Sequence, residues 1–216
     1  KKVKWSDFAI LVRANDQASS YISIMRKANI PNQFIASKGL YTQDIILDIL
    51  SYLKLLDNYH ESTALYRILN LAIYNLNIKS IINLNHLANK KSWSLFYTLK
   101  IYKSYLNLPL ADQRNIKKLL KNIEEHTELA KRKPIYQVVY TWLEDSGYLN
   151  LLTIEDSQSN KEQLDFLNQF FNELREWEEE SLGTESVHNF LEKMDMKLES
   201  GELGSIQYDI ESGPDI

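Results

Sequence analysis

The spacing of hydrophobic and polar positions changes near residue 40 of this 216-residue chain. Before that point, Phe8-Ala9-Ile10-Leu11-Val12 is an unbroken apolar run, typical of a strand buried on both faces. Residues 17–28 repeat apolar positions at helical spacing, and Gln33-Phe34-Ile35 suits a second short strand. The pattern therefore predicts a small α/β unit at the N-terminus, with both strands in one parallel sheet.

From residue 42 onward the apolar positions follow helical spacing almost throughout. Thr42 is the expected cap of a helix with a buried stripe at Ile46, Ile49, Leu50, Leu53 and Leu56. Further helices are predicted near residues 61–70, 78–89, 94–106 and 111–132, between Pro134 and Gly147, from 159 or 160 past Trp177, and over 186–199. A loop is expected over 201–216. The predicted fold class is mostly α, with a small α/β portion followed by an all-helical region.

Composition excludes several kinds of site. The chain has no cysteine, so disulfides and thiolate metal ligands are ruled out. Its four histidines are far apart in sequence and none has a helical ligand spacing, so we expect no metal site. The apolar runs are too short and too often interrupted by charge to span a bilayer, and no signal peptide opens the chain.

The net charge of −4 hides a strong asymmetry between the two halves. Residues 1–108 carry a net charge of +8 and residues 109–216 a net charge of −12. A basic half beside an acidic half suggests a polyanionic partner for one part only. Two solvated surfaces of opposite sign would give the same count, so charge alone leaves both interpretations open.

Short motifs at consistent order and spacing resemble the UvrD/Rep/PcrA family of superfamily 1 DNA helicases. Between residues 7 and 71 they are FAILVRANDQAS at 8–19, similar to helicase motif IV, KANIP at 27–31, GLY at 39–41 with DILSYLKLL at 48–56, and RILN at 67–70. Farther on, YTWLEDSGY at 140–148 resembles a family helix ending in SG, and ESGPDI at 211–216 resembles the acidic linker before motif V.

This resemblance implies an internal fragment of a helicase. Residues 1–74 would be the first part of the RecA-like domain 2A, residues 75–205 the helical inserted domain 2B, and residues 206–216 the linker returning to domain 2A. No G-x-x-x-x-G-K-[ST] loop occurs, so the chain alone is not expected to hydrolyse ATP and no cofactor is expected in it. The parent protein would be an ATP-dependent 3′-5′ helicase using ATP and Mg²⁺, cytoplasmic and associated with the nucleoid.

Two residues at the end of the first predicted strand would face ATP by the same resemblance. Arg13 matches the catalytic arginine that reaches the γ-phosphate across the cleft, where a guanidinium can donate to several oxygens. A surface salt-bridge role for Arg13 is the alternative. Val12 stands where the family usually has an adenine-stacking tyrosine, so the adenine would be held less firmly.

Four residues are candidates for DNA binding. Lys38 and Tyr41 lie where the family touches single-stranded DNA, through a phosphate and a base respectively, although Tyr41 could equally be a core or rim residue. Asn75 and Asn77 stand where the family has the R-G-I-G loop, whose glycine amides hold duplex phosphates, and Tyr74 replaces the basic residue of that motif. Asparagine tolerates positive φ, so the turn could persist while its side chains crowd the phosphate.

The implied partners are single-stranded or tailed duplex DNA, the other domains of the parent helicase, and a protein bound through domain 2B, with no membrane. The alternative function is a helical protein-interaction or regulatory module without DNA binding of its own. The cations Lys131-Arg132-Lys133 suit the end of a helix, whose dipole they complement. The sequence leaves open which DNA pathway, repair among them, is served.

Overall fold

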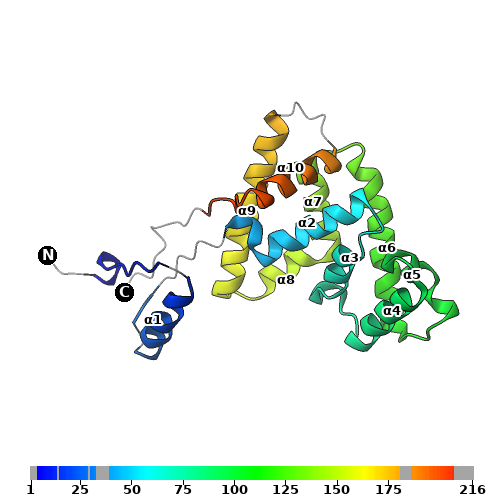
Figure 1. The fold of residues 1–216 in the computed structure, drawn as a ribbon, viewed down its shortest axis with the longest axis horizontal. Helices are drawn as coiled ribbons and strands as arrows, with labels where there is room; N and C mark the ends of the chain where they lie inside the picture. The colour runs from blue at the N-terminus through cyan, green and yellow to red at the C-terminus, as the bar shows by residue number, and fades with distance from the viewer. Residues whose placement is uncertain (1–3, 14, 29, 33–38, 181–185, 207–216) are drawn as a thin grey trace.

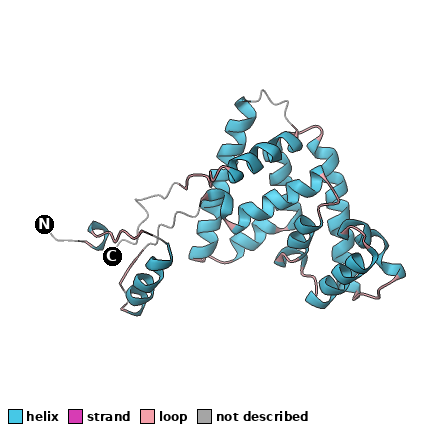
Figure 2. Ribbon diagram, in the orientation of Figure 1, coloured by secondary structure: helices cyan, strands magenta, loops and turns pink. Residues whose placement is uncertain are grey.

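A computed structural model describes residues 4–13, 15–28, 30–32, 39–180 and 186–206 (Figure 1). Every regular element in these ranges is a helix, and Figure 2 shows no strand among them. The α-helices are α1 (Asn15–Lys27), α2 (Asp44–Asp57), α3 (Ser62–Leu69), α4 (Ile78–Lys91), α5 (Leu95–Ile101), α6 (Leu110–Ala130), α7 (Ile135–Ser146), α8 (Tyr148–Ile154), α9 (Gln158–Glu180) and α10 (Val187–Glu199). Short 3₁₀ helices are η1 (Trp5–Asp7), η2 (Leu40–Thr42), η3 (Ala72–Tyr74) and η4 (Tyr102–Ser104).

The helices predicted from apolar spacing are present, with small changes at their ends. The helix expected over 94–106 is divided into α5 and the 3₁₀ helix η4. Gln43, and not Thr42, occupies the N-cap of α2, because the Thr42 hydroxyl donates to the Gly39 carbonyl at 2.8 Å instead. Gly147 ends α7 with a φ of 87°, as a glycine after a helix commonly does.

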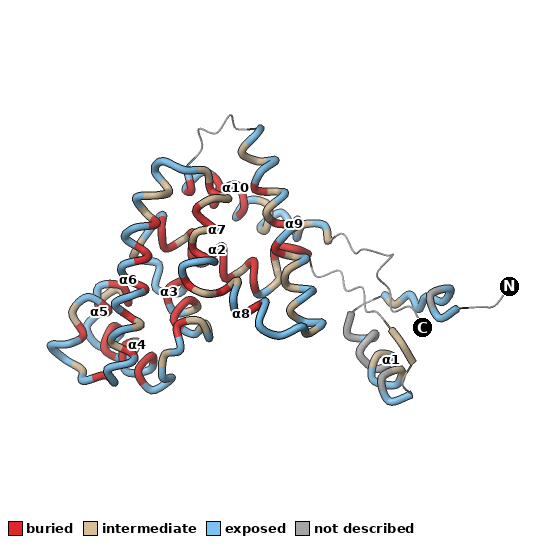
Figure 3. Tube along the Cα trace, turned by 180° about the vertical axis from the view of Figure 1, so that it is seen from behind, coloured by how far each residue is buried: buried red, intermediate tan, exposed pale blue. Residues whose placement is uncertain are grey.

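The predicted α/β portion at the N-terminus is not supported. Residues 8–12 form an irregular segment in which Phe8 is 67% and Leu11 95% exposed, although a buried strand was expected. A strand is stable only when neighbouring strands pair with its backbone, and the described residues supply none. The second expected strand, Gln33–Ile35, lies outside the described residues. In Figures 1 and 3, α1 lies apart from the other α-helices.

Helix α2 is the centre of the helical body, by which we mean residues 39–180 and 186–206. It packs against α3, α6, α9 and α10, and nine of its side chains are buried. A helix that is apolar on nearly every side belongs in an interior, and Figure 3 shows α2 in the buried part of the fold. One hydrophobic core runs from Leu40 to Met194. The domain boundary expected at residue 74 stays a prediction, although the core extends across that position.

The first and last segments of the helical body meet. The Tyr41 N–H donates to the Leu203 carbonyl at 3.0 Å, and the Leu40 N–H donates to the Gly204 carbonyl at 3.4 Å. A Cβ atom on Gly39 would lie 1.9 Å from the Leu203 carbonyl oxygen, so this close approach requires glycine. The chain therefore enters and leaves the helical body at the same place.

Candidate nucleic-acid interface

The turn before α4 brings together two of the residues expected at a DNA site. Asn75 follows η3 with φ 42° and ψ 49°, in the left-handed region that asparagine tolerates better than most residues. Asn77 caps α4, and its side-chain oxygen accepts the Lys79 N–H at 2.9 Å. Both asparagines are exposed. The turn expected from the sequence is thus formed, with Asn75 shaping the backbone and Asn77 starting the helix.

Helix α6 holds this turn in place. The buried Asp112 accepts the Asn77 N–H at 3.3 Å and the Ser80 hydroxyl at 2.5 Å through its two carboxylate oxygens. The Asn115 side-chain amide donates to the Asn75 carbonyl at 3.4 Å. The backbone N–H of Asn77 is therefore occupied by a carboxylate and is not available to a phosphate.

Tyr74 connects the turn to the core. It stands where the family resemblance places an arginine, but it is 3% exposed and its hydroxyl accepts the Trp142 indole N–H at 3.0 Å. The Trp142 ring stacks on Tyr52, with centroids 4.4 Å apart, and the Tyr52 hydroxyl lies 2.7 Å from Nδ1 of His126. Burial raises the pKa of Tyr74. Tyr74 is a structural residue, and its role could not be read from the motif.

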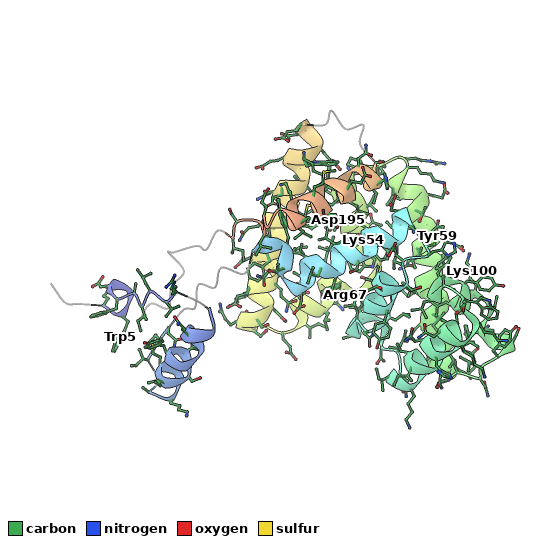
Figure 4. The ribbon with its side chains drawn as sticks, in the orientation of Figure 1. Trp5, Lys54, Tyr59, Arg67, Lys100 and Asp195 are labelled. Atoms are coloured by element: carbon green, nitrogen blue, oxygen red, sulfur yellow. The ribbon has the colours of Figure 1, made fainter. Side chains whose placement is uncertain are left out.

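Three of the short motifs meet at one buried carboxylate. Asp48 of DILSYLKLL accepts from Arg67 Nε of RILN at 2.5 Å and from the hydroxyl of Tyr148, the last residue of YTWLEDSGY, at 2.7 Å. Arg67 also donates to the carbonyl and the carboxylate of Asp44, and is labelled in Figure 4. Burial raises the pKa of Asp48 although the hydrogen bonds from Tyr148 and Arg67 act in the opposite direction. The cluster joins α2, α3 and α8.

The helices after the turn carry a concentrated positive charge. Residues 78–121 contain nine lysines and arginines and one acidic residue, the buried Asp112. All nine cationic residues are exposed, and they are Lys79, Lys90, Lys91, Lys100, Lys103, Arg114, Lys117, Lys118 and Lys121. Lys100, labelled in Figure 4, pairs with Glu124 at 3.2 Å. We call these nine residues, which lie on α4, α5, η4 and the first part of α6, the basic surface. A surface of this kind suits a polyanion.

The other candidate residues do not join this surface. Arg13 is exposed and Val12 half-buried in the irregular segment before α1, and Lys38 lies outside the described residues. Tyr41 is 2% exposed, and its hydroxyl donates to Glu173 at 2.7 Å. This burial agrees with the interpretation of Tyr41 as a core residue, because no ring face is open to a base in this arrangement.

The described part of the chain offers no metal centre. No group of three or more His, Cys, Asp or Glu side chains within it could hold a metal ion. No helix in the same ranges is both long and apolar enough to cross a membrane.

The sequence model of the UvrD-like helicase C-terminal domain matches residues 1–211. The chain belongs to this family. It is 26% identical over 206 residues to the ATP-dependent DNA helicase PcrA of Staphylococcus epidermidis, covering 92% of this chain and 27% of that protein. Identity to PcrA of Staphylococcus aureus is 25% over 203 residues, with coverage of 92% and 27%. For PcrA of Leuconostoc citreum it is 24% over 182 residues, with coverage of 83% and 24%.

This UvrD-like domain spans about a quarter of the length of the curated relatives it matches. The resemblance to UvrD/PcrA-type helicases that the motifs indicated is thereby confirmed. The basic surface of the domain was not recognised from its motifs. Its signal is nevertheless local in the sequence, because nine cations accompany a single acid between residues 78 and 121.

Proposed function

We propose that this chain is the part of an ATP-dependent 3′-5′ DNA helicase in which the helical body binds DNA through its basic surface. The observation that carries the proposal is the set of nine exposed cations on α4, α5, η4 and α6, accompanied between positions 78 and 121 by a single acidic residue, the buried Asp112. Two of the nine, Lys100 and Lys121, pair with Glu124 and Glu125 just beyond this stretch. Membership in the helicase family supplies the partner, since DNA is the polyanion such a protein meets.

Phosphate neutralisation is the chemistry of this surface. Lysine and arginine side chains release condensed counterions when they contact a nucleic-acid backbone, so binding weakens steeply with salt. Asn75 and Asn77 lie at the start of α4, near the exposed Lys79. Their side chains would contact the sugar-phosphate backbone of a duplex. Residues 122–216, which follow the basic surface and carry a net charge of −15 from seven basic and 22 acidic residues, would repel DNA and restrict it to the basic side.

A contribution to ATP binding is the second element of the proposal. Arg13 would supply a guanidinium to the γ-phosphate and Val12 an apolar contact to the base, while Lys38 would meet a DNA phosphate. One cation and one valine fit a nucleotide only as part of a site completed by other domains of the parent protein. Those domains would also provide the groups that hold Mg²⁺ during phosphoryl transfer.

Charge reversal tests the DNA proposal directly. Fluorescence anisotropy of a labelled tailed duplex, titrated at several salt concentrations, should show affinity on the order of 10⁻⁴ to 10⁻⁶ M. The variant Lys117→Glu/Lys118→Glu should bind more weakly, with a salt slope reduced by about one phosphate for each lysine. The matched control is Lys161→Glu/Lys193→Glu, which lies outside the basic surface, among the acidic residues 122–216, and should change little.

Two outcomes would count against the proposal. Equal losses from both double variants would indicate a diffuse charge effect and no defined surface. Absence of binding even at low salt would favour a helical protein-interaction module that binds no DNA itself.

A further inference from the structure

Three aromatic rings form an exposed cluster within the basic surface. The ring of Trp93 meets Tyr97 edge-on, with centroids 5.3 Å apart and planes at 82°, and meets Tyr105 at 5.4 Å and 67°. Tyr97 is 45% and Tyr105 50% exposed, and Trp93 is half-buried. Large rings grouped together normally face a core, so a cluster this open to solvent is available for contact with another molecule.

Backbone geometry holds the rings where they are. Ser92 ends α4 with a φ of 53°, and the Trp93 N–H donates back to the Ala88 carbonyl at 2.9 Å. Ser94 then caps α5, its hydroxyl oxygen accepting the Tyr97 N–H at 3.2 Å. After α5, the Tyr105 N–H donates to the Tyr102 carbonyl at 2.8 Å. Hydrogen bonds therefore define the backbone at all three aromatic residues, which reduces the conformational entropy lost when a ligand binds.

Cationic groups lie directly beside these rings. Nζ of Lys91 is 5.8 Å from the Trp93 ring centroid and 5.7 Å from that of Tyr105. Lys103 and Tyr105 also line an open depression of about 380 Å³, together with Ser104, Leu106, Asn107 and Gln113. Groups that suit a phosphate and groups that suit a planar base thus alternate over a short distance.

We infer that the Trp93–Tyr97–Tyr105 cluster is a stacking site for unpaired bases of single-stranded nucleic acid. The inference rests on the proposed function and assigns a particular ligand to one part of the basic surface. Positive charge selects a polyanion, while exposed aromatic faces select one that offers planar rings. Duplex DNA is a poorer fit, because its base faces are covered by stacking and only their edges are accessible. In a bound strand, bases would lie on Tyr97 and Tyr105, and phosphates would face Lys91 and Lys103.

An abasic oligonucleotide separates stacking from charge. It carries the same phosphates as an oligothymidylate of equal length but no bases, so anisotropy titrations with the two probes at one salt concentration isolate the contribution of the bases. Wild-type protein should bind oligothymidylate at least about fivefold more tightly than the abasic strand. Tyr97→Ala/Tyr105→Ala should remove this preference, and Tyr97→Phe/Tyr105→Phe should retain it because the ring faces remain.

Matched controls keep the outcomes distinct. Tyr140 on α7 is 51% exposed, nearly the same fraction as Tyr105, but it is not part of the cluster. Tyr140→Ala should therefore leave the preference for bases unchanged. Lys117→Glu/Lys118→Glu should weaken the binding of both probes by the same factor. If wild type binds both probes equally, the stacking inference is wrong while DNA binding by the basic surface stands. If neither probe binds at low salt, the proposed function itself fails. Circular dichroism of each variant confirms that it is folded.

Discussion

Arg67 on α3 and Asp48 on α2 form an ion pair, Nε to Oδ1 at 2.5 Å, in which the aspartate side chain is only 5% exposed. A carboxylate this far from water is stable only with hydrogen-bonding partners of opposite charge or strong polarity. Two motifs that identify the family are therefore explained by a packing requirement between neighbouring helices.

Removal of the arginine should destabilise the protein. In Arg67→Ala the buried Asp48 loses its cation and keeps only the Tyr148 hydroxyl, so we expect a loss of about 1.5–3 kcal/mol in the free energy of unfolding. Lys54→Ala is the control, because Lys54 pairs with Asp195 at 3.0 Å and their side chains are 39% and 50% exposed. Both residues are labelled in Figure 4. That pair should be worth less than about 1 kcal/mol. Urea denaturation measures both, and equal losses would contradict the argument.

Tyr74 should matter for stability through a single oxygen atom. The substitution Tyr74→Phe keeps the ring but leaves the Trp142 indole N–H without its acceptor inside the core. A buried donor without a partner costs about 1–3 kcal/mol. Tyr140→Phe, at an exposed position, provides the control and should be neutral. Thermal unfolding that is unchanged in Tyr74→Phe would show that the hydrogen bond contributes nothing.

Because Asn75 has a left-handed backbone conformation, two substitutions at this position should have different effects on stability. Its positive φ is freely accessible to glycine, so Asn75→Gly should be tolerated. A side chain branched at Cβ is strained in this region, and Asn75→Val should cost about 1–2 kcal/mol. Asn107→Val, a change of the same chemistry at another exposed loop position, serves for comparison. Chemical denaturation distinguishes these cases, and equal stability of the glycine and valine variants at position 75 would refute a left-handed turn.

The pair between α10 and α2 should make stability depend on pH. His188 Nδ1 lies 2.9 Å from the Asp57 carboxylate, and this hydrogen bond, with the charges of Asp57 and Glu192, raises the pKa of His188. Because the folded state prefers the protonated imidazole, the pair stabilises the fold fully below the ordinary histidine pKa of about 6.5. That contribution is lost as pH rises through the raised value.

The variant His188→Gln tests this dependence. Wild type should exceed it in stability by more at about pH 5.5, below the ordinary histidine pKa, than at about pH 9, well above that pKa. Unfolding in urea at the two pH values gives the comparison. A difference that is constant with pH, or that grows as pH rises, would exclude the assigned role of Asp57.

Arg13 can be tested only in the parent helicase. If its guanidinium stabilises the charge that develops on the transferring phosphoryl group, Arg13→Ala should lower kcat for ATP hydrolysis by at least about a hundredfold. KM should change much less, because the contact strengthens in the transition state. Arg26→Ala, on α1, is the control. Hydrolysis within about twofold of wild type would mean that Arg13 has no such role.

The sequence was a good guide wherever structure depends on local spacing. Apolar positions repeat along α2, α6 and α10, and a helix satisfies its own backbone hydrogen bonds, so these elements follow from short stretches of sequence. The strand expected at Phe8–Val12 depends on pairing partners elsewhere, and without them Phe8, Ile10 and Leu11 are exposed. The local sequence pattern shows which residues a segment could bury, but it does not show whether another part of the protein packs over them.

In the candidate site, too, the features that depend on local sequence were predictable and those that depend on distant residues were not. The left-handed turn at Asn75 was predictable because it depends on one residue's backbone preference. The burial of Tyr41 against Glu173, and of Tyr74 against Trp142, depends on residues more than sixty positions away. No motif comparison could show that a tyrosine in the place of a basic residue serves the core.

The hydrogen bonds from Tyr41 to Leu203 and from Leu40 to Gly204 determine where this protein could be cut and rejoined. Since the helical body begins and ends on adjacent backbone segments, its first and last residues lie side by side. A spacer of about three residues would bridge the opening left by its excision. Whole bodies could accordingly be exchanged between relatives at Gly39 and Leu203, or fused to other scaffolds there, with the flanking chain left in its original course.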